Sequence, residues 1–448
     1  VVGIVLIMAF VPFFSGMFVA FDMEPTDNAQ FLRSQIWESV VFTTSQAFFS
    51  TALVILLCPI FGLALLFSPR RYFKYSSILR TLVFCLPSVV TATGIILFWG
   101  KHGLASHISD YLKMSGLSSH WLYSKYAIVL VNVSINLPFA SLLIARTARS
   151  VDLASIKSVL MLGLSPWKTL TVLFWPSIRA QLYYLAGLNF LLCMSSFGAL
   201  NILSGPTGGN TLEIGIYHSL FLNGDWHAAA FYSAIHTALA ATISLIFMPK
   251  QFTSSGNHLL DNSSPETGVD FLKSNLPESP TTRIGAIVLT VFFDFLTIMP
   301  LIATIIDASG DFNRIIRPDS DLASFSLAAV LQSLKFAVPA ATLGSCFAWA
   351  VARTYSHYRL LRRPTLSMII LLSVFALSIV PSMANAFGFF ALKTWFPQFE
   401  SNTVPIIILH ATMALPFLTT IALNNFTRHE NRFFIYGHLT GLRSTWNL

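Results

Sequence analysis

Long apolar runs separated by short polar stretches dominate the pattern of this chain. A helix needs roughly 20 residues to cross about 30 Å of hydrocarbon, and in lipid its backbone polar groups must be paired within the segment. The pattern therefore predicts an all-α, polytopic membrane protein. Ten segments are predicted to span the membrane, namely residues 1–20, 39–67, 78–99, 125–145, 181–203, 228–249, 284–306, 323–352, 365–392 and 404–424.

The composition agrees with this prediction. Of the 448 residues, 54% are hydrophobic and only 10% are charged, whereas soluble domains carry about 25% charged residues. The first segment lacks the basic leading region and small-residue cleavage site of a signal peptide, so we predict that it is a span. The four cysteines lie in apolar segments without paired spacing, which predicts neither a disulfide framework nor a metal site. We expect no cofactor.

The formal net charge of +8 comes from basic residues that gather in particular connections. Acidic residues gather after the first and seventh spans, whereas basic residues follow the second, fourth and eighth. The positive-inside rule then places the even-numbered connections in the cytoplasm, and no nucleic-acid partner is needed to explain the charge. The basic residues are Arg70, Arg71, Lys74, Arg80, Arg146, Arg149, Lys157, Lys168, Arg179, Arg353, Arg359, Arg362 and Arg363.

Short sequences recur between the two parts of the chain. Residues 137–139 (LPF) return at 415–417 and residues 163–164 (GL) at 441–442, both at an offset of 278, and 87–88 (PS) returns at 381–382 at an offset of 294. Each copy falls at the same place relative to its spans, so the halves run in the same direction.

The predicted organisation follows from this repeat. A first transmembrane half of six helices covers 1–249, a Ser-, Asn- and Pro-containing cytoplasmic linker covers 250–283, and a second half with four helices covers 284–448. By symmetry, we expect two further spans to follow Leu448 in a longer protein.

The connection after the fourth span predicts a bent pair of short helices. Residues 152–162 suit a helix with an apolar stripe formed by Ile156, Val159, Leu160 and Leu162. Gly163 can adopt the left-handed conformation that ends a helix, and Ser165 and Pro166 suit the start of a second one that runs towards Pro176. Such a pair could dock on a cytoplasmic partner, or it could lie on the bilayer surface.

This connection resembles the cytoplasmic loop in the membrane subunits of ATP-binding-cassette (ABC) importers. The family pattern is Glu-Ala-Ala, three residues, Gly, nine residues and Ile-x-Leu-Pro. Here Gly163, the spacing and Pro176 match, but Lys157, Ser158 and Val159 replace Glu-Ala-Ala. Leu164 follows the glycine, and in the second half Gly437, Gly441 and Leu442 lie at the corresponding positions.

The resemblance implies a type I ABC importer transmembrane fold in a bacterial inner (plasma) membrane. It also implies two cytoplasmic ATP-binding subunits, which dock on the loops at Gly163 and Gly441, and a periplasmic substrate-binding protein. The chain has no Gly-x-x-x-x-Gly-Lys-Ser/Thr phosphate loop, so ATP hydrolysis is expected on a separate subunit and the chain is not expected to be an enzyme.

Within this family, the first half looks most like the permeases of thiamine and thiamine diphosphate importers. The segments that carry this likeness are 46–51 (QAFFST), 100–103 (GKHG), 136–141 (NLPFAS), 193–197 (CMSSF) and 208–220 (GGNTLEIGIYHSL). The alternatives are a permease for ferric iron or another small solute and, from a different class, an ion-coupled secondary transporter. The paired glycine-centred loops favour the importer over the carrier.

A few residues are candidates for the transport pathway. Glu213 either contacts a cationic substrate or, with Asn210, forms a capping box. Asp294, inside the seventh span, forms an ion pair for which Lys335 is a candidate partner, faces the cavity, or relays protons. Phe197 and Tyr217, with Trp226, form either an outer aromatic gate or part of an interface belt.

Overall fold

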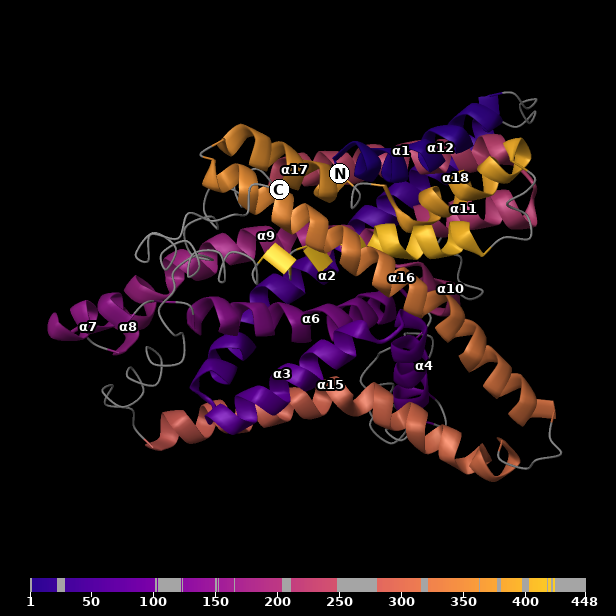
Figure 1. Ribbon diagram of the computed structural model, residues 1–448. Helices are drawn as coiled ribbons and strands as arrows, with labels where there is room; N and C mark the ends of the chain where they lie inside the picture. Colours follow the sequence, from indigo (N-terminus) through magenta and orange to yellow (C-terminus); the bar gives the residue numbers. More distant parts are fainter. Residues whose placement is uncertain are drawn as a thin grey trace. The chain divides into compact units, whose positions relative to one another are not determined.

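The computed structural model describes residues 2–21, 29–100, 124–149, 153–164, 166–203, 211–247, 280–315, 321–361, 363–376, 380–396 and 403–416, with a few single residues besides. These residues are almost wholly helical and include no strand, so the all-α prediction is confirmed (Figure 1). In chain order the helices discussed below are α1 (Val2–Phe21), α2 (Ala29–Phe67), α3 (Arg70–Cys85), α4 (Ser88–Trp99), α6 (Lys125–Arg149), α7 (Leu153–Met161), α8 (Pro166–Leu173), α9 (Trp175–Met194), α10 (Phe197–Leu203), α11 (Leu212–Tyr217), α12 (Trp226–Phe247), α15 (Pro280–Ile315), α16 (Asp321–Leu360), α17 (Pro364–Ala376) and α18 (Ser382–Trp395).

Several of these helices are suited to crossing a membrane. Within the described residues, five helices are long and apolar enough, namely α2, α6, α12, α15 and α16, and two bent pairs raise the number to seven if each pair is one span. Ten spans were predicted; α18 and the helix Val404–Pro416 are apolar but shorter. The prediction of a polytopic helical membrane protein is confirmed.

Two predicted spans are broken at a proline. The segment 78–99 is not one helix, because α3 and α4 meet at an angle of 101°. Leu86 is extended, with φ −66° and ψ 141°, and Pro87 begins α4. A residue that precedes proline is disfavoured in the helical region, which explains the break. The segment 365–392 is likewise divided into α17 and α18, and Pro381 precedes α18.

The helices form two compact units. One comprises residues 1–25 and 327–448, and in it α1 packs against α17 and α18. The other comprises residues 26–326, and in it α15 packs against α2, α3 and α4. The first helix of each predicted half therefore packs among the helices of the other half. The division at 250–283 stays a prediction, since almost all of that linker lies outside the described residues.

The helix contacts in the two units have the same form. A Cβ atom at Gly94 of α4 would clash with the backbone of Pro300 on α15, so only glycine permits this approach. Gly388 of α18 accepts a hydrogen bond of 2.9 Å from Ser15 Oγ of α1. Gly94 and Gly388 are separated by 294 residues, the offset of the two Pro-Ser pairs. Small residues at close helix crossings are typical of membrane helices.

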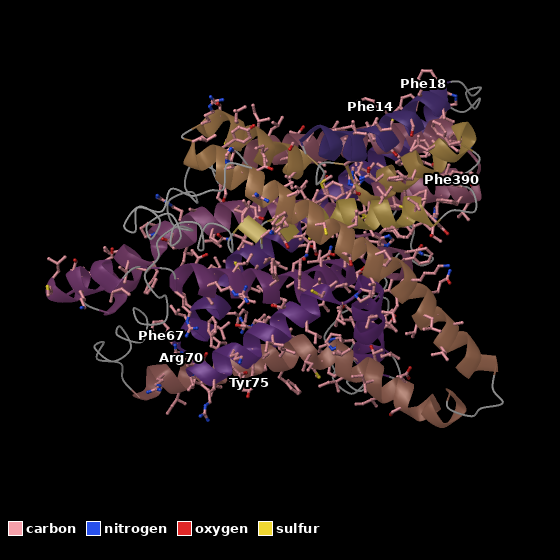
Figure 2. The ribbon with its side chains drawn as sticks, viewed as in Figure 1. Phe14, Phe18, Phe67, Arg70, Tyr75 and Phe390 are labelled. Carbon is pink, nitrogen blue, oxygen red and sulfur yellow. The ribbon has the colours of Figure 1, made fainter. Side chains whose placement is uncertain are left out.

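Large apolar side chains cover the outside of the bundle. Figure 2 shows Phe14 and Phe18 projecting from α1, where they are 62% and 65% exposed. Tyr75 projects from α3 and is 69% exposed. Such exposure is expected where the surrounding solvent is lipid rather than water.

Candidate functional site

The short helices α7 and α8 form an arm that follows α6 and precedes α9, and Figure 1 shows them beyond the end of α6. Gly163 lies between them with φ +61°. No atom lies within 4 Å of a Cβ atom built on it, so the glycine is required by the backbone conformation and not by crowding. The predicted helix, glycine, helix arrangement is confirmed, and we call α7, Gly163 and α8 the arm.

The arm has a buried base. Ile156 and Val159 of α7 and Leu173 of α8 belong to one buried apolar cluster with Phe174, the residue before α9. Leu164, beside Gly163, packs against this cluster. Pro176 is exposed near the start of α9, where a proline is compatible with a helix because the first N–H groups have no helical partner.

The tip of the arm is apolar and open. Met161 is 86% exposed and Leu162 is 72% exposed, so the predicted stripe does not lie wholly on one buried face. Lys157 and Ser158 are also exposed on α7, whereas Val159 is buried. The corresponding residues of the second half, Gly437, Gly441 and Leu442, lie outside the described residues.

An aromatic cluster lies where α10 meets α11. The centroid of the Tyr217 ring is 5.3 Å from that of Phe197, 5.4 Å from that of Phe221 and 5.9 Å from that of His218. Phe221 and His218 were not among the residues named from the sequence. They lie on the π-helix η2 (His218–Leu222). Short π-helices are rare and often occur at functional sites.

Glu213 lies one turn before Tyr217 and has no exposed surface. Its Oε1 is 3.9 Å from Nδ1 of His236 on α12, which is equally buried. The cap of α11 is Thr211, whose hydroxyl accepts a hydrogen bond of 3.3 Å from the N–H of Ile214. Asn210, the residue with which Glu213 could form a capping box, lies outside the described residues.

A seam of polar side chains joins α2, α6 and α9, and the sequence reading missed it. Gln46 Nε2 donates to the carbonyl oxygen of Cys193 at 2.8 Å and Asn132 Nδ2 donates to Gln46 Oε1 at 2.8 Å. Asn189 Nδ2 donates to Thr51 Oγ1 at 3.0 Å. Amide side chains within apolar spans were the available signal, because in lipid they need partners on neighbouring helices.

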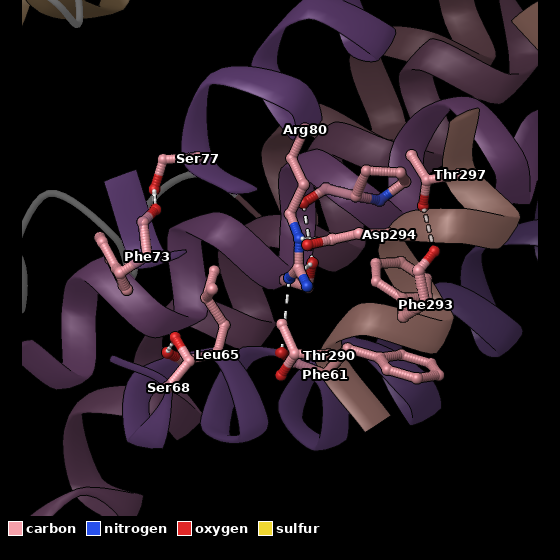
Figure 3. A network of polar contacts seen from close by, with 12 residues as sticks. Phe61, Leu65, Ser68, Phe73, Ser77, Arg80, Thr290, Phe293, Asp294 and Thr297 are labelled. Atoms are coloured by element: carbon pink, nitrogen blue, oxygen red, sulfur yellow. Dashed lines mark hydrogen bonds and ion pairs between the residues drawn. The ribbon is translucent and has the colours of Figure 1, made fainter. Parts of the chain in front are cut away.

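Asp294 of α15 forms a buried ion pair with Arg80 of α3, rather than with the suggested Lys335 (Figure 3). The Arg80 Nε atom donates to Asp294 Oδ1 at 2.8 Å, and the Tyr72 hydroxyl donates to Oδ2 at 2.9 Å. Arg80 is one of the basic residues that the sequence analysis grouped after the second span, and its side chain has no exposed surface.

No metal-binding arrangement occurs in the part of the chain that the structure describes, where no three His, Cys, Asp or Glu side chains gather. All four cysteines are free; Cys58 and Cys193 are buried, and Cys85 and Cys346 are exposed.

Comparison with known proteins shows that the chain is similar to transport permeases. It is 26% identical to the thiamine transport system permease protein ThiP of Haemophilus influenzae over 439 residues, covering 96% of this chain and 78% of the relative. It is 27% identical to ThiP of Salmonella typhimurium over 405 residues, covering 87% and 70%. The resemblance to thiamine permeases is confirmed. No protein-family model matches the chain.

A more distant relative has a different substrate in its name. The putative 2-aminoethylphosphonate transport system permease protein PhnU of Salmonella typhi is 24% identical over 216 residues, which is 47% of this chain and 73% of the relative. These relatives are permease proteins of transport systems. Together with the apolar helices, they confirm the expected membrane location.

Proposed function

We propose that this chain is the transmembrane subunit of an ATP-driven importer of thiamine or its phosphate esters in a bacterial inner membrane. The observation that carries the proposal is the arm, which has a buried base and an open tip at the position where the importer family docks its ATPase. The thiamine permeases that match up to 96% of the chain support the choice of substrate.

In this proposal, two cytoplasmic ATP-binding subunits dock on the two arms. Lys157, Ser158 and the tip beyond them form the contact on the first arm, and Gly163 sets the angle between its helices. Val159 and Leu164 pack at the buried base of the arm, and Pro176 lies at the start of α9. Gly437, Gly441 and Leu442 mark the second docking site. A periplasmic binding protein delivers the substrate.

The aromatic cluster is proposed as part of the outer gate. Thiamine carries a cationic aromatic ring, and a cation over an aromatic face gains about 0.5–2 kcal/mol, more when water is excluded. Phe197 and Tyr217 supply such faces, and the centroids of their rings are 5.3 Å apart. Glu213 lies one helical turn before Tyr217, and its wholly buried carboxylate supports the gate rather than contacting substrate directly. Asp294 is proposed to act through its ion pair with Arg80 and not as a proton relay.

Uptake in cells tests the substrate. The complete permease, expressed with its transport-system partners in cells that lack thiamine uptake, is expected to restore accumulation of labelled thiamine. Unlabelled thiamine diphosphate should compete, whereas ferric iron and 2-aminoethylphosphonate should not. Restored uptake of either of the last two without thiamine uptake would contradict the substrate and leave the importer class intact.

A further inference from the structure

A buried ion pair between α3 and α15 is the strongest unexplained feature of the unit that comprises residues 26–326 (Figure 3). Arg80 has no exposed surface and the side chain of Asp294 is 6% exposed. Removing two charges from water costs free energy that their attraction offsets only in part, so a buried pair is weak evidence for stability. In a membrane segment, such groups more often mark a functional element.

The predicted internal repeat indicates that packing does not require charge at this place. The offset of 294 that relates Pro87 to Pro381 makes Val374 of α17 the counterpart of Arg80. Val374 is wholly buried in an apolar cluster with Val351, Ile370 and Leu415. The same fold therefore accepts an aliphatic side chain here in one half and a charged network in the other.

The ion pair is connected to the base of the arm. The Arg80 guanidinium lies 4.7 Å from the centroid of the Phe293 ring, and Phe293 stacks on Phe61 at 4.0 Å. Phe293 belongs to the same buried cluster as Ile156 and Val159 of α7. One buried cluster therefore extends from the arm base to the Phe293 ring beside Arg80.

Helix α3 also holds the helix that leads into the arm. Arg80 Nη1 donates to Ser141 Oγ of α6 at 2.8 Å. The guanidinium of Arg149, the last residue of α6, lies 3.7 Å from the centroid of the Phe73 ring on α3. Contacts from α3 thus hold α6 at two places, and at one of them the same arginine is paired with α15.

We propose that Arg80 and Asp294 are positioning residues that couple the arm to α15, so that displacement of the arm by the ATPase moves α15 with α3 and α6. This rests on the proposed function. Within the described residues, the second-half position that corresponds to Arg80 carries the uncharged Val374, so the coupling is assigned to the arm at Gly163.

The test replaces the network by apolar side chains of similar volume. The variant Arg80→Met, Asp294→Leu, Tyr72→Phe removes both charges. The Tyr72→Phe change also removes the hydroxyl that would otherwise lose its hydrogen-bond acceptor, the Asp294 carboxylate. Lys74→Met on the exposed face of α3 is the matched control. Each complete permease is reconstituted with its ATP-binding subunits and binding protein, and thermal unfolding, ATP hydrolysis and labelled thiamine uptake are measured.

We expect the triple variant to unfold at the wild-type temperature or above, to hydrolyse ATP, and to carry about ten-fold fewer thiamine molecules per ATP. Lys74→Met should match the wild type in every measurement. An unchanged ratio of uptake to hydrolysis in a folded triple variant would overturn the coupling role. If instead the triple variant fails to assemble, the charge exchange Arg80→Asp, Asp294→Arg decides. Assembly with a restored ratio of uptake to hydrolysis would support the coupling role, and assembly without it would overturn that role. Absence of ATP-driven uptake in the wild type would refute the proposed function, a separate result.

Discussion

Substitution of Gly163 should weaken ATPase binding by straining the backbone of the arm. Gly163 has φ +61°, and a Cβ atom there would meet nothing within 4 Å. An added side chain therefore has no steric clash with neighbours, and only the left-handed conformation opposes it. That conformation costs an L-residue roughly 1–2 kcal/mol, which corresponds to a factor of about 5–30 in population.

The expected order follows from residue type. Asn tolerates the left-handed region, so Gly163→Asn should lose least, Gly163→Ala should weaken binding by up to about 30-fold, and Gly163→Val should lose most because it is β-branched. Binding of the labelled ATP-binding subunit to the complete permease in nanodiscs measures the effect. An arm that adopts its docking geometry less often has an apparent affinity reduced by the same fraction.

Gly224 provides a matched control for this series. It has φ +67°, equally open surroundings and a place after η2 rather than in the arm. Gly224→Ala should carry the same backbone cost and leave ATPase affinity unchanged. The reasoning is refuted if Gly163→Val binds as tightly as the wild type, or if Gly224→Ala weakens binding to the same extent.

Two further predictions concern packing and the gate. Gly94→Leu should force α4 away from α15 and destabilise the protein by about 1–3 kcal/mol, because its Cβ atom would collide with the backbone of Pro300. Gly285→Leu on α15, where nothing lies within 4 Å, should leave the melting temperature of the purified permease unchanged. Equal melting temperatures for the two variants would contradict the close approach of α4 to α15. Tyr217→Ala should reduce thiamine uptake about 10-fold or less, as expected for loss of one cation–π contact of about 1 kcal/mol. Tyr217→Phe keeps the aromatic face and should retain uptake. Equal uptake by the two variants would exclude the Tyr217 ring from the transport pathway.

Much of the fold could be predicted because lipid imposes a simple rule. Apolar length identified the membrane helices α2, α6, α12, α15 and α16, and the local signals at Gly163 and Pro166 predicted both arm helices. These features depend on residues close together in the chain. The breaks before Pro87 and Pro381 also had a local cause, but apolar length alone concealed them.

The remaining features depend on long-range packing that periodicity does not encode. The partner of Asp294 was missed because Arg80 is 214 residues away and lies near basic residues that indicate topology. The packing of α1 and α15 among the helices of the other predicted half could not be read from hydropathy, which treats each span alone. The available sequence signal was the recurrence of glycine 294 residues apart, at Gly94 and Gly388. Each of these glycines lies in close contact with the first helix of the other half.

Transport in a purified system tests the central claim most directly. The complete permease is reconstituted in proteoliposomes with its ATP-binding subunits on the arm side and its binding protein on the opposite side, and movement of labelled thiamine is measured with ATP, with a non-hydrolysable analogue, or with a proton gradient alone. The account predicts movement of thiamine away from the binding protein only when ATP is hydrolysed. Movement driven by the proton gradient without the ATP-binding subunits would contradict it.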